Sequence, residues 1–299
     1  MKKPNLFIVG APKCGTTSLH GYLAEHPRIF MSVPKEPCYF DKDLPLRDSV
    51  RTEAEYLRLF AAADERHLVL GEASANYLYS KVAVPNILAF NPQARFIVMI
   101  RNPIDMAISL HSYLVQHMVE DVADFEAAWS LQQERRQGRS LPASSLPPEF
   151  VMYGPFCRVG EQLKRLYERV PRERTHVILF DDLCQDPRQV YRGVLRFLDL
   201  PDDGREHFPV QNVTRAPQSL GYHRALSSLF ALRLALPIPR LGIGLFDKLK
   251  RFNMAPAKRR EISSEFRLRL IEYFRADVEL LSTLVASDLT SWLNDTAAT

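Results

Sequence analysis

The sequence of 299 residues predicts an α/β fold of three layers, in which a central, mostly parallel sheet is flanked by helices. Apolar runs of the kind that form strands buried on both faces occur at 6–9, 96–100 and 176–180. Segments with the apolar spacing of amphipathic helices lie between and after them, at 53–63 and 265–293. Because strand patterns alternate with helix patterns, we expect parallel strands joined by helical crossovers.

The composition is that of an ordinary soluble globular protein, with 46% apolar and 25% charged residues. The net charge of +4 suits an anionic ligand and is too small to indicate a nucleic-acid partner. The four cysteines form no C-x-x-C pair and no zinc-type spacing with histidine, so we expect reduced thiols in a cytoplasmic protein. The apolar stretch at 229–246 contains arginines and prolines, which argues against an integral membrane segment.

The first apolar run continues into a loop at 10–15 and then into an amphipathic helix, which is the arrangement of an anion site. The first N–H groups of a helix have no partner within the helix, and the helix dipole adds positive charge there. Gly10 and Gly15 allow the main chain to approach a phosphate closely. Hydroxyl groups supply further donors at Thr16, Thr17 and Ser18. The pattern therefore predicts a P-loop-type unit of strand, phosphate-binding turn and helix.

The position of the lysine separates two kinds of phosphate loop. The Walker A loop of ATP-binding proteins has lysine directly after its second glycine, where Thr16 stands here. The lysine of this loop is Lys13, which lies inside the turn. A P-loop kinase or ATPase, and a nucleotide-binding protein without catalytic activity, remain alternatives at this point.

The stretch Pro12-Lys13-Cys14-Gly15-Thr16-Thr17 resembles the P-K-x-G-T-T loop of the sulfotransferases. In that family the loop binds the 5′-phosphosulfate end of 3′-phosphoadenosine 5′-phosphosulfate (PAPS). The resemblance implies that PAPS is the co-substrate and that it is bound by Lys13, Cys14, Gly15, Thr16, Thr17 and Ser18. Further matching segments, in the family's order, extend the resemblance over residues 5–200.

A second anion site is predicted where the apolar run at 96–100 ends in Arg101. The carboxyl ends of the strands are where open α/β sheets bind ligands, and the planar guanidinium suits a phosphate. Asn102 is a plausible N-cap for a helix that follows, and an ion pair between Arg101 and Asp105 is the structural alternative. The segment resembles the family motif R-x-P-x-x-x-x-x-S, which implies that Arg101 and Ser109 bind the 3′-phosphate of PAPS.

A candidate general base lies in the loop that contains Glu36, between Pro34 and Pro37. The prolines favour an extended conformation, and a carboxylate on a stiff loop can accept a proton, although a solvated surface glutamate is the alternative. The loop resembles the K-E-x-H-F-F-D stretch of glycan sulfotransferases, which implies that Glu36 removes the acceptor proton. Cys38 stands where a histidine is common, so any contribution of that histidine is absent.

Two further residues are alternative bases. Glu72 follows the short apolar run at 68–70 in a loop that resembles the G-E-K-[ST]-P-x-Y stretch of the family. Ala73 replaces the lysine that some glycan-specific members use, so the sequence does not favour a heparan-like acceptor. His111, on the helix after Arg101, is the third candidate because it could reach the acceptor.

The late part of the resemblance is looser. The run at 176–180 ends in Asp181, which imitates a Walker B aspartate for Mg²⁺, but without the Walker A lysine we expect no metal. Phe180 stands where many members have an adenine-contacting tyrosine. Arg215 occupies the place of a nucleotide-gripping loop, and the Lys/Arg-rich segment at 237–260 is either a solvated lid or a patch for an acidic acceptor or a membrane surface.

Together these patterns predict a PAPS-dependent sulfotransferase formed by one domain over residues 1–299, with a helical or lid region from about 215 to 299. The resemblance implies an in-line displacement that transfers a sulfuryl group to a hydroxyl or an amine and releases adenosine 3′,5′-bisphosphate. It also implies that Lys13 stabilises the transferred group and that Glu36 is the base. The acceptor, whether small molecule, glycan or lipid, and the oligomeric state are not specified by any pattern.

Overall fold

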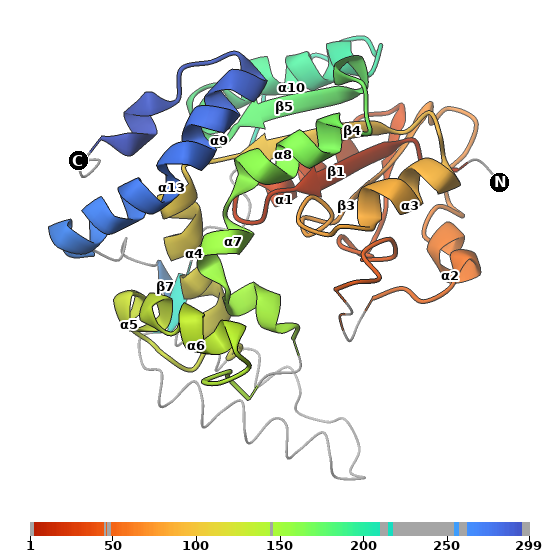
Figure 1. Ribbon diagram of the computed structural model, residues 1–299. Helices are drawn as coiled ribbons and strands as arrows, with labels where there is room; N and C mark the ends of the chain where they lie inside the picture. The colour runs from red at the N-terminus through yellow and green to blue at the C-terminus, as the bar shows by residue number, and fades with distance from the viewer. Residues whose placement is uncertain are drawn as a thin grey trace.

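The computed structural model describes residues 3–44, 46, 49–143, 146–209, 215–217, 254–256 and 262–294. Its centre is a five-stranded sheet in the order β2-β3-β1-β4-β5, in which every neighbouring pair is parallel (Figure 1). The strands are β1 (Leu6–Gly10), β2 (Ile29–Met31), β3 (Val69–Ala73), β4 (Arg95–Ile100) and β5 (Thr175–Leu179). This confirms the predicted α/β fold with a parallel sheet.

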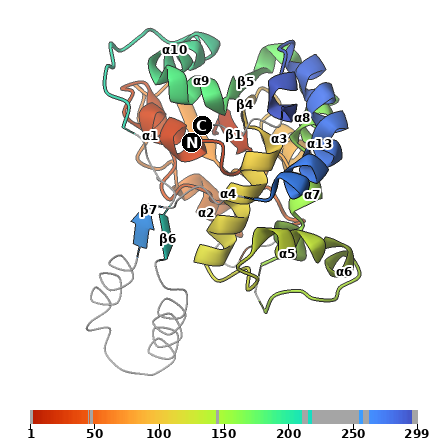
Figure 2. The same cartoon turned by 90° about the vertical axis from the view of Figure 1, so that its left-hand side faces the viewer.

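Helices cover both faces of the sheet, which gives the three predicted layers. Figure 2 shows α1 and α10 on one side of the strands and α8 and α13 on the other. The helices are α1 (Thr16–Ala24), α2 (Glu53–Arg58), α3 (Ala83–Phe90), α4 (Pro103–Gln116), α5 (Phe125–Ser130), α6 (Gln132–Arg136), α7 (Tyr153–Phe156), α8 (Val159–Tyr167), α9 (Phe180–Gln185), α10 (Pro187–Phe197) and α13 (Ser264–Val285). Short 3₁₀ turns are η1 (Pro148–Val151), η2 (Arg172–Arg174) and η3 (Thr290–Leu293), and a small antiparallel pair is β6 (Arg215–Pro217) with β7 (Met254–Pro256).

The boundaries of three predicted elements differ from the structure. The helix expected at 53–63 ends at Arg58, after starting from a capping box at Thr52. The helix expected at 265–293 ends at Val285, because Ala286 adopts a left-handed conformation with φ 53°. The strand expected at 176–180 ends one residue early, since Phe180 already begins α9.

The central strands are apolar throughout because both of their faces are covered. Every residue of β1 is buried, and the side chains of Leu6, Phe7, Ile8 and Val9 are fully inaccessible to solvent. Burying one such side chain stabilises the fold by about 1.5–3 kcal/mol. This burial explains why the strands are continuous apolar runs rather than alternating ones.

The parallel arrangement brings the loops that follow the strands to one edge of the sheet. The loops after β1, β2 and β3, and the residues directly after β4 and β5, all lie at this carboxyl edge. The sheet therefore collects segments from the first 180 residues at the edge where open α/β sheets bind ligands.

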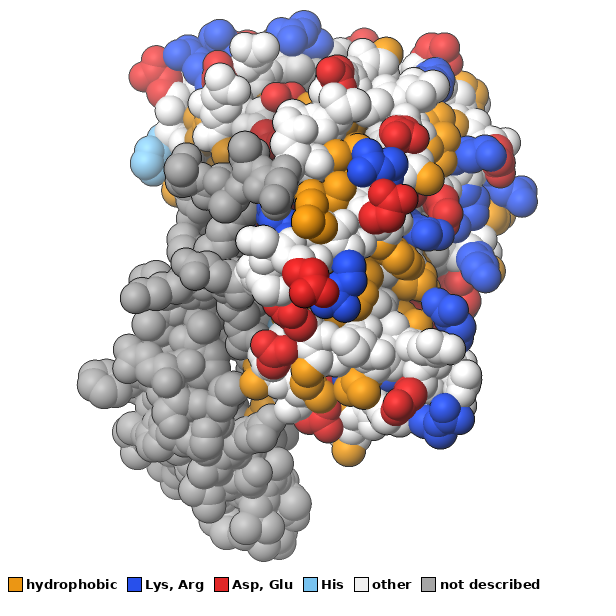
Figure 3. Space-filling view, turned by 60° about the vertical axis from the view of Figure 1, so that its left-hand side comes forward, with side chains coloured by type: hydrophobic (Ala, Val, Ile, Leu, Met, Phe, Trp, Pro, Cys, Tyr) orange, Lys and Arg blue, Asp and Glu red, His pale blue; other side chains and the backbone are white. Residues whose placement is uncertain are grey.

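Two surface properties bear on possible partners. On the face shown in Figure 3, cationic and anionic side chains of the described residues are interspersed and not gathered by sign. Within the described ranges, no helix combines the length and the low polarity that crossing a bilayer requires. The basic segment at 237–260 lies almost entirely outside the described residues, so its predicted lid or patch role stays a prediction.

Candidate functional site

The phosphate loop has the geometry that the sequence predicts. Gly15 is the N-cap of α1 with φ 87°, and no described side chain caps this helix end. A Cβ atom on Gly15 would lie 2.7 Å from Leu183 Cδ2, so glycine is required by both conformation and space. Since Gly15 has no side chain to cap the helix, the first N–H groups of α1 face the loop, as an anion site needs.

Lys13 lies in the middle of this loop in a strained conformation, with φ 65°. Left-handed backbone at a residue other than glycine costs about 1–3 kcal/mol and is concentrated at functional sites. The Lys13 Nζ atom lies 4.7 Å from the ring centroid of Tyr113, which is 41% exposed. Burial, and next the charge of Arg101, lower the pKa of Lys13 below its ordinary value of 10.5.

Arg101 reaches the same loop from the end of β4. Its Nη1 atom donates a hydrogen bond to the main-chain oxygen of Lys13 at 3.4 Å. Its guanidinium carbon lies 4.6 Å from the ring centroid of Phe180, the first residue after β5. The structure thus brings together a lysine, an arginine and an aromatic ring that the sequence places on three separate strand ends.

Glu36 lies on the loop after β2 and is also in a left-handed conformation, with φ 63°. Its N–H donates to the main-chain oxygen of Ala73 at 2.9 Å, which ties the loop to the end of β3. Its carboxylate is 42% exposed and pairs with Lys35 Nζ at 2.5 Å. Glu36 and Lys35 both act electrostatically on Lys13, Glu36 raising its pKa and Lys35 lowering it.

Glu72 is completely buried and serves as the centre of a hydroxyl network. Tyr56 Oη donates to Glu72 Oε1 at 2.7 Å, and Ser74 Oγ donates to Oε2 at 2.7 Å. A third and longer bond comes from Tyr77 Oη to Oε1 at 3.2 Å. Burial raises the pKa of Glu72 to about 7, although the three hydrogen bonds act in the opposite direction.

The same hydroxyl groups hold the loop that contains Glu36. Ser74 Oγ accepts a hydrogen bond from the N–H of Cys38 at 3.2 Å, and Tyr77 Oη accepts one from the N–H of Tyr39 at 2.9 Å. Cys38 has φ 48°, so these bonds fix a strained stretch of backbone. The buried carboxylate of Glu72 therefore orients the groups that position the loop.

A family model described as the sulfotransferase family matches residues 4–204, which is more than half of the chain. The chain belongs to the sulfotransferase family.

Individual relatives agree with this assignment. The crystal structure of a sulfotransferase from Alicyclobacillus acidocaldarius is 27% identical, covers 98% of this chain and 100% of its own, and superposes with a TM-score of 0.72. Carbohydrate sulfotransferase 15 from Homo sapiens is 32% identical over 151 residues, which cover 37% of this chain and 27% of the human protein. A bifunctional heparan sulfate N-deacetylase/N-sulfotransferase 1 from Caenorhabditis briggsae is 25% identical over 226 residues, 74% of this chain and 25% of that protein. This chain therefore spans about a quarter of the length of either curated relative.

The remaining predicted ligands of this sulfotransferase lie on α1, on α4, in the phosphate loop and on β6. Thr16 and Ser18 are buried in the first turn of α1, Thr17 is half-buried beside them, and Ser109 is half-buried on α4. Cys14 is fully buried, and burial raises the pKa of its thiol to about 12, so the thiol is neutral. The thiol donates to the main-chain oxygen of Pro12 at 3.4 Å within the loop. For Arg215 the structure describes only the backbone of β6, so its predicted contact lies outside the described side chains.

The structure corrects one candidate base. His111 is fully buried, its Nε2 atom lies 2.9 Å from the main-chain oxygen of Val122, and its ring packs against Phe125 and Tyr153. The expectation that His111 could reach an acceptor is therefore wrong. Helical spacing showed where His111 lies along α4, but it did not show that the segment containing Val122 covers it.

Asp181, the residue that imitates a Walker B aspartate, has a protein partner. Its Oδ2 atom accepts a hydrogen bond from the indole N–H of Trp292 at 3.2 Å. Among the residues that the structure describes, no group of three or more His, Cys, Asp or Glu side chains is placed to hold a metal ion.

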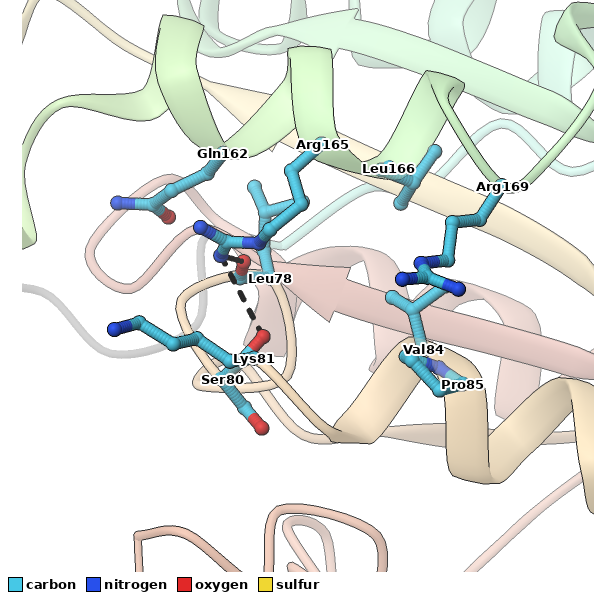
Figure 4. A pocket seen from close by; sticks show the side chains of 9 residues that line it. All are labelled: Leu78, Ser80, Lys81, Val84, Pro85, Gln162, Arg165, Leu166 and Arg169. Atoms are coloured by element: carbon cyan, nitrogen blue, oxygen red, sulfur yellow. Dashed lines mark hydrogen bonds between the residues drawn. The ribbon is translucent and has the colours of Figure 1, made fainter.

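A small pocket between α3 and α8 lies beside the loop after β3 (Figure 4). Arg165 extends from α8 into it and donates to the main-chain oxygens of Leu78 at 2.7 Å and Tyr79 at 2.8 Å. The cavity measures about 10 Å³, which is room for about one water molecule. This pocket is therefore a structural junction between α8 and the loop and is too small for a nucleotide.

Proposed function

We propose that this protein transfers a sulfuryl group from PAPS to a hydroxyl or an amine and releases adenosine 3′,5′-bisphosphate. The observation that supports this most strongly is the contact between Lys13 and Arg101 at the carboxyl edge of the sheet. A lysine in the loop after β1 and an arginine at the end of β4, joined through this main-chain contact, suit a nucleotide that has charged groups at both its 5′ and 3′ positions. Membership of the sulfotransferase family supports the same assignment.

The donor set fits such a co-substrate. Gly15 allows the left-handed turn in which the loop passes closely against Leu183 and Phe180, and the start of α1 offers N–H groups to an anion. We assign the 5′ end to Lys13, Cys14, Gly15, Thr16, Thr17 and Ser18, with Cys14 acting through its main chain. Arg101 and Ser109 bind the 3′-phosphate, Phe180 faces the adenine, and Arg215 is a further ligand in this proposal.

The chain's own residues would promote the reaction by positioning and by charge stabilisation. A bond forms between the acceptor atom and sulfur while the bond from sulfur to the 5′-phosphate oxygen breaks. Lys13 stabilises the negative charge that develops on the leaving oxygen, and Glu36 accepts the proton that the acceptor loses. Lys35 pairs with Glu36 and holds its carboxylate near Lys13.

Burial supports Glu36 rather than Glu72 as the base. The Glu36 carboxylate is partly exposed, so an acceptor can approach it. Glu72 is inaccessible, and its two oxygens already accept three hydroxyl hydrogen bonds. A residue so enclosed is suited to holding the loop and not to meeting an acceptor.

The relatives' names and one position in the loop after β3 bear on the acceptor class. The curated relatives are named for carbohydrate and heparan sulfate, so a carbohydrate hydroxyl or amine is the first acceptor to test. Ala73, where some glycan-specific members have lysine, argues against a heparan-like chain. Small molecules and lipids are tested as acceptors in the same experiment, because the cell extract contains them.

We also propose that residues 1–299 form one sulfotransferase domain. The C-terminal helix α13 supports this, because it packs against α8 and α4. Asp277 on α13 accepts hydrogen bonds from the N–H groups of Gly160 at 3.0 Å and Glu161 at 2.9 Å, at the start of α8. The helical part of the predicted C-terminal region is thus integral to the fold. The cytoplasmic location stays a prediction.

The test uses PAPS labelled with ³⁵S, the purified protein and a cell extract, followed by identification of the labelled product. We expect transfer that persists in EDTA, because Lys13 supplies the cation in place of a metal. Thermal melting is compared with adenosine 3′,5′-bisphosphate and with Mg-ATP. A larger stabilisation by Mg-ATP would support a P-loop kinase or ATPase instead. Stabilisation by the bisphosphate without transfer to any acceptor would support a nucleotide-binding protein that lacks catalytic activity.

A further inference from the structure

The C-terminal turn η3 reaches the carboxyl edge of the sheet through Trp292. In Figure 1 the dark-blue end of the chain turns back after α13 toward the side on which β5 ends. The indole N–H of Trp292 donates to Asp181 Oδ2 at 3.2 Å, and the main-chain oxygen of Trp292 accepts from Asn102 Nδ2 at 3.2 Å. Trp292 is 8% exposed, so its ring is largely enclosed. One residue thus bonds to the N-terminal ends of α4 and α9 at the ligand edge.

The two partners of Trp292 are the chain neighbours of two proposed nucleotide ligands. Asn102 directly follows Arg101, and Asp181 directly follows Phe180. The side chain of Asn102 is held at both ends, since its Oδ1 accepts the N–H of Ile104 at 2.9 Å as the N-cap of α4. Trp292 therefore connects the backbone segments on which Arg101 and Phe180 are mounted.

These segments need a connection because the ladder between β4 and β5 stops just before them. Its last registered pair is Ile100 with Leu179. Beyond that pair, the relative placement of Arg101 and Phe180 depends on side-chain contacts, including the 4.6 Å contact between the guanidinium and the ring. Trp292 bridges the two segments one residue past this contact.

We propose that Trp292 is a positioning residue that fixes Arg101 relative to Phe180 and thereby sets the affinity of the site for a 3′-phosphorylated adenosine nucleotide. This inference rests on the proposed function, in which Arg101 binds the 3′-phosphate. Residue 292 lies outside the segment 4–204 that matches the family model, so that match assigns it no role.

The test measures a ratio of affinities, which a merely structural role would not change. Dissociation constants for adenosine 3′,5′-bisphosphate and for AMP are determined by calorimetry in the wild type, Trp292→Phe and Trp292→Ala. We expect the preference for the bisphosphate to fall by about three- to tenfold in Trp292→Ala, with AMP affinity little changed, because Trp292 acts on Arg101 only through hydrogen bonds to neighbouring residues. Trp292→Phe keeps an aromatic ring and loses the indole N–H. Its preference for the bisphosphate should lie between that of the wild type and that of Trp292→Ala.

A mutant cycle tests the link to Asp181. Asp181→Ala should lower the preference in the same direction, and combining it with Trp292→Phe should add little, because both changes remove the same bond. Trp129→Phe is the matched control, since Trp129 packs among aromatic residues of α5 and α13 such as Phe125 and Tyr273. It should leave the ratio unchanged.

The outcomes separate this inference from the proposed function. A wild type without preference for the bisphosphate over AMP would overturn the proposed function, and the inference with it. A wild type with that preference, and with the same ratio in both Trp292 variants, would overturn the inference alone. An equal loss of affinity for both nucleotides in the Trp292 variants would also overturn the inference, because Trp292 would then only support the fold. If Trp292→Ala does not fold, Trp292→Phe and Asp181→Ala decide the question.

Discussion

Arg101 donates a hydrogen bond to the main-chain oxygen of Lys13 over 3.4 Å, although the two residues are 88 positions apart in the chain. The bond joins the end of β4 to the phosphate loop after β1, and these strands are neighbours in the sheet. Burial, and next the positive charge of Arg101, lower the pKa of Lys13. An anionic ligand between Lys13 and Arg101 would relieve that repulsion, which is the electrostatic basis of the proposed nucleotide site.

Replacing Lys13 by alanine should abolish most of the turnover without unfolding the protein. Loss of one preorganised donor at a developing negative charge typically lowers kcat by about 10²–10³-fold. The side chain of Lys13 contacts an exposed ring, so its removal should cost little stability. Sulfuryl transfer and thermal melting are measured together, with Lys164→Ala on the exposed side of α8 as control. Normal transfer by Lys13→Ala would remove Lys13 from the mechanism.

Replacing Glu36 by glutamine should stop transfer and leave nucleotide binding intact. General base catalysis contributes roughly 10²–10⁴-fold, and glutamine keeps the shape of the side chain without its basicity. Transfer rates are compared with dissociation constants for adenosine 3′,5′-bisphosphate, and Glu53→Gln on the exposed face of α2 is the control. If Glu72→Gln abolished transfer while Glu36→Gln remained active, the assignment of the base would be wrong.

Replacing Arg101 by alanine should weaken the binding of adenosine 3′,5′-bisphosphate far more than the binding of AMP. Charge-assisted hydrogen bonds are worth about 1.5–3 kcal/mol, which corresponds to about 10- to 100-fold in affinity. Arg101→Lys should fall short of the wild type, because lysine keeps the charge and loses the planar fork. Calorimetry with both nucleotides measures the difference, and Arg196→Ala, exposed on α10, is the control. Equal losses for both nucleotides would place Arg101 away from the 3′-phosphate.

The free energy of unfolding should fall as pH rises from 4.5 to about 7, the two pKa values of Glu72. Its pKa is about 7 in the folded state and 4.5 as the reference, so the folded state holds the proton more tightly. The stabilising contribution is therefore complete below pH 4.5 and is lost as pH rises to 7, by up to about 3 kcal/mol in the free energy of unfolding.

Glu72→Gln mimics the protonated form and should flatten this part of the profile. Urea unfolding at about six pH values between roughly 4.5 and 8 measures the pH dependence of the free energy of unfolding, with Glu53→Gln as control. A residual slope of the same sign is expected from Asp41, because burial raises its pKa to about 7 as well. A slope that is unchanged in Glu72→Gln would show that Glu72 is ionised in the folded protein across this range.

The parts of the site that the sequence predicted are those that follow from local patterns. The apolar run before Arg101 predicts the end of a strand, and the N-cap residue Asn102 predicts the start of a helix. Both predictions depend only on nearby residues, and the structure has β4 and α4 at these positions. The spacing from Gly10 to Gly15 likewise predicts a turn before α1. Since parallel strands end at one edge, these local predictions were enough to bring Lys13 and Arg101 to the same side of the sheet.

The roles of Glu72, His111 and Trp292 depended on contacts between distant segments. A short polar loop after a strand is compatible with a base at its surface and equally with a buried anchor, and the difference for Glu72 is made by the hydroxyls of Tyr56 and Tyr77. No periodicity or spacing shows that Trp292 bonds to Asp181, which lies 111 positions away. Backbone preferences and apolar spacing act over a few residues and can be read along the chain. Burial and hydrogen-bond partners are established only when the sheet and its covering helices pack together. This packing leaves the carboxylate of Glu36 partly exposed to solvent and buries that of Glu72.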